Sequence, residues 1–142
     1  MGLNGRRAAA AGCVAVAVSW LGLFFHNVAD LPGHSVLDPE SAVPALVAVG
    51  LLVVWLASRG HLMARRALLA WGWLHLVGGA LSVLPLPVLP YAPEQSLHHY
   101  AAHAVYAAAQ LPLVLGFAST LPRPRADRAP PRRRRLDELN GR

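Results

Sequence analysis

The sequence contains no lysine and only one cysteine, and charged residues make up just 14% of its 142 positions. The single Cys13 excludes an intramolecular disulfide and leaves the redox compartment of the protein open. With so few charges and 55% hydrophobic residues, the chain is too apolar for a soluble domain of this length. We therefore expect a small integral membrane protein.

Common catalytic signatures are missing as well. The chain has no G-x-S-x-G, no H-E-x-x-H and no glycine-rich phosphate loop with lysine. Asp30 and Glu94 form no evident acid–base pair. We expect a protein that is not an enzyme and that acts through helix packing, with itself or with other membrane subunits.

Four apolar windows are long enough to cross a bilayer, which takes roughly 20 residues at about 1.5 Å rise per residue. They cover residues 8–29, 41–58, 67–86 and 99–121. Short connections make consecutive helices antiparallel neighbours. The predicted fold class is therefore all-α: an antiparallel four-helix transmembrane bundle over residues 1–121.

The thirteen arginines fall on alternate sides of these windows. Successive segments outside the windows carry two, none, three, none and eight of them. Short arginine-rich segments stay on the cytoplasmic side during insertion. We expect four spans in the plasma membrane of a bacterium, with both termini cytoplasmic and the first span retained as a signal anchor.

The last segment, residues 122–142, is rich in arginine and proline. Such a composition cannot bury enough apolar surface to fold, so we expect a disordered tail. Beside a membrane exit its arginines attract anionic headgroups at about 1 kcal/mol each, which makes lipid rather than nucleic acid the expected partner. The arginines expected to face lipid are Arg123, Arg125, Arg128, Arg132, Arg133, Arg134 and Arg135.

Polar residues within the windows share single helical faces. Such stripes face the interior of a bundle, because lipid cannot satisfy polar groups. One stripe lies on the first window and another on the last, and their members are Ser19, His26 and Asp30, and His99, His103, Tyr106 and Gln110. We expect Tyr106 and Gln110 to bridge helices.

Some residues of the two stripes should lie at the same depth in the membrane. Counted from the cytoplasmic edge, His26 lies about 27 Å up its span and His103 about 24 Å, whereas His75 lies only about 12 Å up. The first and fourth helices of an up-down bundle are neighbours. His26, Asp30, His99 and His103 should therefore converge near the outer surface.

Four interpretations of this cluster remain open. Imidazoles at positions i and i+4, with a third from a neighbouring helix, suit Zn or Cu, with His26, His99 and His103 as ligands and Asp30 as a ligand or second-shell acceptor. Histidines on two facing helices also hold haem b. Alternatively, His26, His98 and His99 rest at the interface and bind headgroups or loop carbonyls. A proton or solute path is the fourth interpretation.

The last window, HHYAAHAVYAAAQLPLVLG, resembles one helix of the caa3-type oxidase assembly membrane proteins. In that family an H-x-x-x-H pair precedes a proline–leucine run, and His99, His103 and Pro112 take the matching positions. The resemblance covers one span of the four. It implies copper handling and makes copper the preferred metal.

Two expectations concern packing. Pro112 frees a backbone carbonyl one turn earlier and should kink the last span. Trp55, Trp71 and Trp73 lie near the cytoplasmic turn, where they should form part of an aromatic belt at the membrane interface.

Overall fold

The computed structural model describes residues 2–85 and 94–119. The helices are α1 (Leu3–Asp30), α2 (Pro39–Ala57), α3 (Leu62–Trp73) and α4 (Leu97–Ala118). A π-helix, η1 (Leu74–Gly79), and a 3-10 helix, η2 (Ala80–Val83), continue α3 without a break. No strand occurs in these two ranges. The prediction of an all-α, four-helix fold is confirmed.

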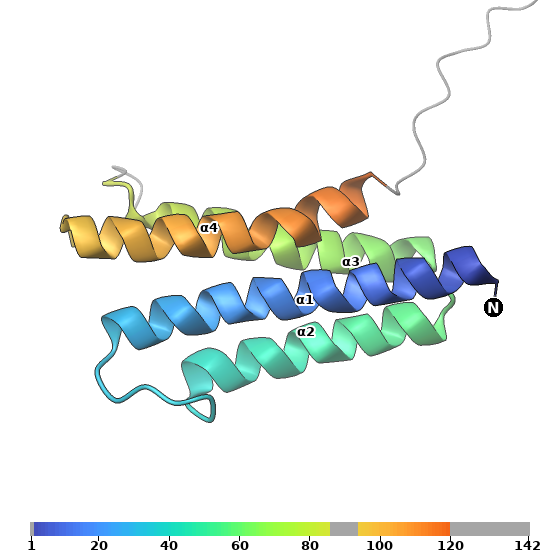
Figure 1. Ribbon diagram of the computed structural model, residues 1–142, viewed down its shortest axis with the longest axis horizontal. Helices are drawn as coiled ribbons and strands as arrows, with labels where there is room; N and C mark the ends of the chain where they lie inside the picture. The colour runs from blue at the N-terminus through green and yellow to red at the C-terminus, as the bar shows by residue number, and fades with distance from the viewer. Residues whose placement is uncertain (1, 86–93, 120–142) are drawn as a thin grey trace, which may run out of the picture.

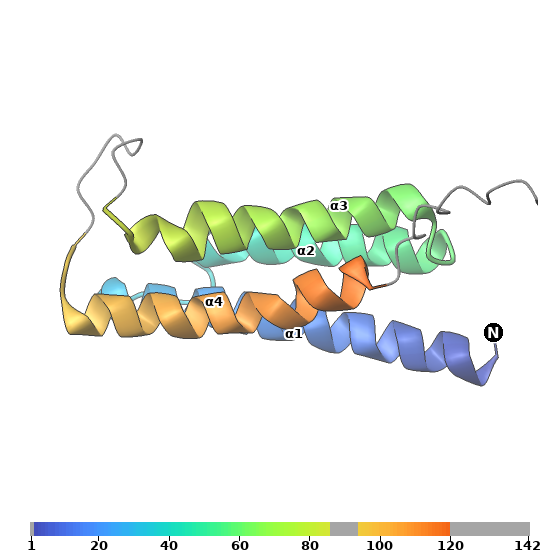
Figure 2. The ribbon, with the colours of Figure 1, turned by 90° about the horizontal axis from the view of Figure 1, so that it is seen from above.

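Consecutive helices run antiparallel and form a bundle (Figures 1 and 2). α1 packs most extensively against α4 and also against α2, and α3 packs against both α2 and α4. The start of α1, the α2–α3 turn and the end of α4 share one end of the bundle. The α1–α2 loop and the start of α4 share the other end.

Charge is separated between these two ends. The arginine end carries Arg6, Arg7, Arg59, Arg65 and Arg66, and the acidic end carries Asp30, Asp38, Glu40 and Glu94. These are all the arginines and carboxylates within the described ranges. These groups define the arginine end and the acidic end of the bundle.

Three of the helices, α1, α2 and α4, are long and apolar enough to cross a membrane. The segment that would form the remaining span is divided among α3, η1 and η2, with 12, 6 and 4 residues. By length and composition, the described helices fit a multi-pass membrane protein.

Two helices begin earlier than the apolar windows predicted. α1 starts at Leu3 rather than residue 8, and α3 starts at Leu62 rather than residue 67. Hydropathy reports only the apolar part of a helix, whereas backbone hydrogen bonding continues beyond it. At the start of α3, the His61 ring accepts a hydrogen bond from the Met63 amide and caps the helix.

The other boundaries lie close to the prediction. α2 and α4 span 39–57 and 97–118, against predicted windows of 41–58 and 99–121. Some predicted parts lie outside the described residues: residue 86, residues 120–121 and the predicted disordered tail at 122–142 with its predicted lipid-facing arginines.

The π and 3-10 turns of the third segment were not predicted. The π-helix ends with the pair Gly78 and Gly79, and a Cβ added to Gly79 would lie 2.8 Å from the Tyr106 hydroxyl. Only glycine allows α4 to approach this closely. The irregular turns leave carbonyls without helical partners, and the Ser82 hydroxyl donates to the Gly79 carbonyl at 2.6 Å.

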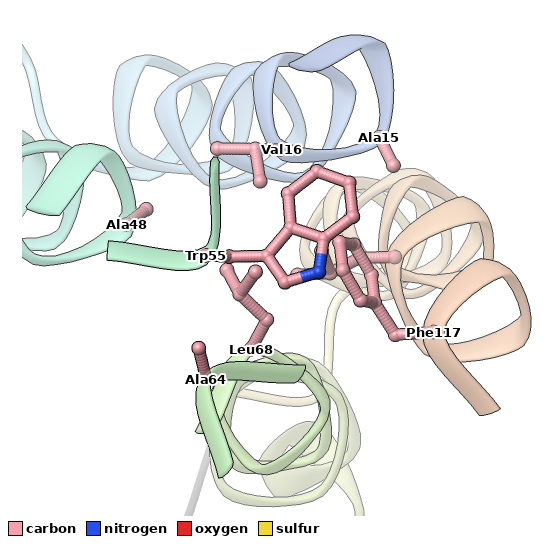
Figure 3. Close-up of a cluster of buried hydrophobic side chains, with 8 residues drawn as sticks. Ala15, Val16, Ala48, Trp55, Ala64, Leu68 and Phe117 are labelled. Atoms are coloured by element: carbon pink, nitrogen blue, oxygen red, sulfur yellow. The ribbon is translucent and has the colours of Figure 1, made fainter. Parts of the chain in front are cut away.

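A hydrophobic core fills the arginine half of the bundle (Figure 3). Trp55 lies in this core, only 9% exposed, with its ring 5.1 Å from that of Phe117. The prediction that Trp55 belongs to an interfacial belt is therefore wrong. Gly12 explains the difference, because a Cβ there would lie 2.7 Å from the indole. Because Gly12 has no Cβ, the Trp55 ring can pack inward.

Gln110 joins α1 to α4 near the middle of the bundle. Its side chain is fully buried, accepts from the Ser19 hydroxyl at 2.6 Å and donates to the Ser19 carbonyl at 3.0 Å. This confirms the expected bridge. Beyond it α4 bends at the arginine end (Figure 2), as Pro112 within the helix predicts.

Candidate metal centre

The structure brings together the four residues predicted to converge. His26 and Asp30 lie one turn apart on α1, and His99 and His103 lie one turn apart on α4. The His103 ring centroid is 4.3 Å from that of His26 and 4.5 Å from that of His99. This cluster lies at the acidic end, and we call it the histidine cluster.

Asp30 lies between two of the imidazoles. Its Oδ2 is 3.1 Å from Nδ1 of His26 and 2.8 Å from Nδ1 of His99. Even so, Asp30 Oδ2 and His26 Nδ1 are buried atoms that make no aligned hydrogen bond within the described part of the chain. Leaving a buried polar atom unsatisfied costs about 1–3 kcal/mol. A cation between them would satisfy both atoms.

The third imidazole is oriented by the backbone. His103 is 6% exposed, and its Nδ1 lies 2.8 Å from the Ala80 carbonyl oxygen. A carbonyl only accepts, so Nδ1 carries the proton and Nε2 keeps a free lone pair. Metal-binding histidines are typically fixed in this way. Ala80 is the first residue of the 3-10 helix η2, which packs against α4.

The spacing of the donors fits a single ion. One ligand atom each from His26, Asp30 and His103 lies within 4.8 Å of the others. Two ligands at 2.0–2.1 Å from a tetrahedral ion lie about 3.3 Å apart, so small side-chain rotations would close the site. His99 contacts Asp30 and can supply a fourth ligand or orient the carboxylate.

The donor chemistry narrows the choice of metal. Imidazole and carboxylate suit Zn²⁺ and Cu²⁺, whereas Cu⁺ prefers the sulfur ligands that this cluster lacks. Haem b fits less well, because its axial histidines stand on opposite faces of the macrocycle. Here the His26 and His103 rings contact each other directly. The geometry favours a single ion over haem.

Tyr106 closes the cluster on the side of the bundle interior. Its ring stacks on His26 at 5.4 Å and is almost parallel to it, at 9°. Its hydroxyl lies 2.5 Å from Nδ1 of His75, on η1. As the depth estimate predicted, His75 lies deeper than the cluster, and Tyr106 connects the two. The sequence did not predict that Tyr106 would lie directly beneath the histidine cluster.

His98 behaves as the interfacial interpretation described. It is exposed, and its Nε2 lies 3.2 Å from the Ala29 carbonyl near the end of α1. It therefore satisfies a helix-end carbonyl. His98 and the histidine cluster lie at the same end but in different chemical settings.

A second polar network beside the cluster was missed by sequence reasoning. Pro44 has no N–H to offer the Glu40 carbonyl, and the Asn27 side-chain amide donates to that oxygen at 3.2 Å. Asn27 also donates to the Ser41 hydroxyl, which lies 2.7 Å from the His34 ring. The proline in α2 and the lone amide in α1 were the available signals. This network fixes α2 against α1.

No protein-family model matches this chain, and no curated protein or solved structure is significantly similar to it. The likeness of α4 to one helix of the oxidase assembly proteins therefore stays an expectation carried by His99, His103 and Pro112. Function has to be argued from the residues and geometry of the chain itself.

Proposed function

We propose that the chain is a four-span protein of the bacterial plasma membrane with both termini in the cytoplasm. The separation of charge supports this, because arginines at one end and carboxylates at the other match the positive-inside rule. The unbroken helical segment Leu62 to Val83 supplies the fourth span, and its first turns hold Arg65 and Arg66 at the cytoplasmic interface.

We propose further that the protein binds one Zn²⁺ or Cu²⁺ ion at its outer end, through His26, His103 and Asp30 with His99 beside them. The observation that carries this proposal is the pair of buried atoms His26 Nδ1 and Asp30 Oδ2, which lie 3.1 Å apart without an aligned hydrogen bond and within reach of a third ligand from His103. The ion would be held by both atoms, whose close polar neighbours are otherwise each other and the His99 ring.

Such a site suits metal handling rather than catalysis. With His99 as the fourth ligand the coordination sphere is closed, whereas catalytic sites keep one position open for water or substrate. The cluster lies within about two turns of the outer ends of α1 and α4, so ions can exchange with the outside. We therefore propose a non-enzymatic role in holding or passing on a metal ion.

Helix docking is a second candidate function. A shallow apolar groove of about 450 Å³ runs between α1 and α4 and is lined by residues such as Phe24, Phe25 and Val105. Such a groove fits a helix of another subunit or of a second copy. A proton or solute path has less support, because the core around Trp55, Leu68 and Phe117 would block it.

Elemental analysis of the purified protein tests the metal proposal. Protein prepared in detergent without chelators, incubated with Zn²⁺ or Cu²⁺ and then dialysed, should retain about one ion per chain and show no Soret band. Retention should fall at acidic pH, because protons compete with the metal for imidazole. Protein that retains neither ion under these conditions would leave helix docking as the better account.

A further inference from the structure

A second cavity lies at the arginine end, far from the histidine cluster. Its volume is about 380 Å³, within the range of small-molecule sites. It opens between the start of α1 and the turn that joins α2 to α3. The residues that matter for its chemistry are Ala8, Ala9, Trp55, Leu56, Arg59 and Arg65.

The side-chain polar groups that line this cavity are all hydrogen-bond donors. Arg59 and Arg65 bring guanidinium groups, one N–H of Arg65 donating to the Gly60 carbonyl at 3.4 Å, and Trp55 brings its indole N–H. The indole nitrogen is buried and has no acceptor within the described residues. It faces the wall of the cavity formed by Gly60, since a Cβ on Gly60 would lie 3.5 Å from it. These donors suit a ligand that accepts hydrogen bonds and carries negative charge.

Arg59 holds an unusual backbone conformation at this cavity. It directly follows the cap of α2 and has φ +53°, in the left-handed region. The amides of Arg59 and Gly60 bond back to the Leu56 and Trp55 carbonyls, as in helix ends that normally place glycine at this position. A side chain is disfavoured here, and strained residues of this kind gather at ligand sites.

The remainder of the cavity is apolar. Ala8 and Ala9 of α1 face Leu56 and the Trp55 ring across it. An anionic group bound by the arginines would thus continue into an apolar slot. A free inorganic anion has no apolar part to place in this slot, whereas a phospholipid fills it with the start of its acyl chains.

We propose that this cavity binds one anionic phospholipid of the cytoplasmic leaflet. Its phosphate lies against Arg59, Arg65 and the Trp55 indole N–H, because guanidinium forks match phosphate oxygens. This inference rests on the proposed membrane orientation but not on the metal site.

Native mass spectrometry of the full-length protein in neutral detergent tests the proposal. With equal amounts of phosphatidylglycerol and phosphatidylcholine, one phosphatidylglycerol should be retained per chain. Arg59→Gly should weaken this binding roughly 10-fold or more, because a charge-assisted hydrogen bond is lost. The same variant should unfold at the same or a higher temperature than wild type, because glycine relieves the strained φ.

The matched control is Arg66→Gln. Arg66 is exposed at the same end and does not line the cavity, and its loss changes the net charge by the same amount. It should bind phosphatidylglycerol as wild type does, and so should His103→Ala, whose change lies at the metal site.

Three results would overturn the lipid site. The first is equal retention of both lipids, and the second is equal weakening by Arg59→Gly and Arg66→Gln, which would indicate general charge attraction. The third is displacement of the lipid by inorganic phosphate at equal concentration, which would indicate an anion site without an acyl component.

Discussion

Replacing His103 with alanine should remove metal binding, with the affinity for Zn²⁺ or Cu²⁺ falling at least about 100-fold. His103 is the central ring of the cluster, and its Nδ1 is held by the Ala80 carbonyl. Loss of an outer-shell partner alone costs about 10- to 100-fold in affinity, and loss of a ligand should cost no less. Equilibrium titration of the detergent-purified protein measures the change.

Two further variants separate metal binding from folding. His103→Gln keeps a donor for the Ala80 carbonyl but has no imidazole, so it should lose the metal and keep thermal stability. His98→Ala removes an exposed histidine on the same helix, which lies against the Ala29 carbonyl rather than the cluster. It should bind metal as wild type does. If His103→Gln bound metal with unchanged affinity, the assignment of His103 as a ligand would be wrong.

Asp30→Asn then decides the role of the carboxylate. Asparagine keeps the size of the side chain but not its charge. A loss as large as that of His103→Ala would make Asp30 a ligand. A loss of about 10- to 100-fold would make it an acceptor that orients His26 and His99.

A reporter that works only in the cytoplasm should be active when fused after Arg142 and inactive when fused after Pro39. α4 ends at the arginine end, and Pro39 begins α2 at the acidic end. Under the positive-inside rule these ends lie on opposite sides of the membrane, so the difference should be all or none. A fusion after Gly60, in the turn at the arginine end, should be active. Activity after Pro39 would refute the proposed orientation.

The sequence predicted those features that follow from the regular geometry of helices. The spacing of His26 and Asp30, and of His99 and His103, places each pair on one face, and the rise per residue places both pairs at one depth. Antiparallel neighbours then bring the pairs together. The convergence seen in the structure needs no further information.

Features that depend on irregular backbone or on individual packing contacts could not be predicted. The carbonyl that orients His103 belongs to the 3-10 helix that follows the π-helix in the third segment. Trp55 is buried because Gly12, on another helix, leaves room for it. Arg59 lies at a position that normally favours glycine, so no local preference points to its conformation. Each depends on tertiary contacts that no window of sequence contains.

X-ray absorption at the metal edge of the loaded wild-type protein tests the central claim most directly. Loaded with Zn²⁺, the proposed site should give nitrogen and oxygen ligands at about 2.0–2.1 Å, with the outer-shell signals of imidazole. His103→Gln should reduce the imidazole signal or leave no metal to measure. A shell of sulfur at about 2.3 Å, or oxygen ligands without imidazole, would contradict the assignment of the ion to the histidine cluster.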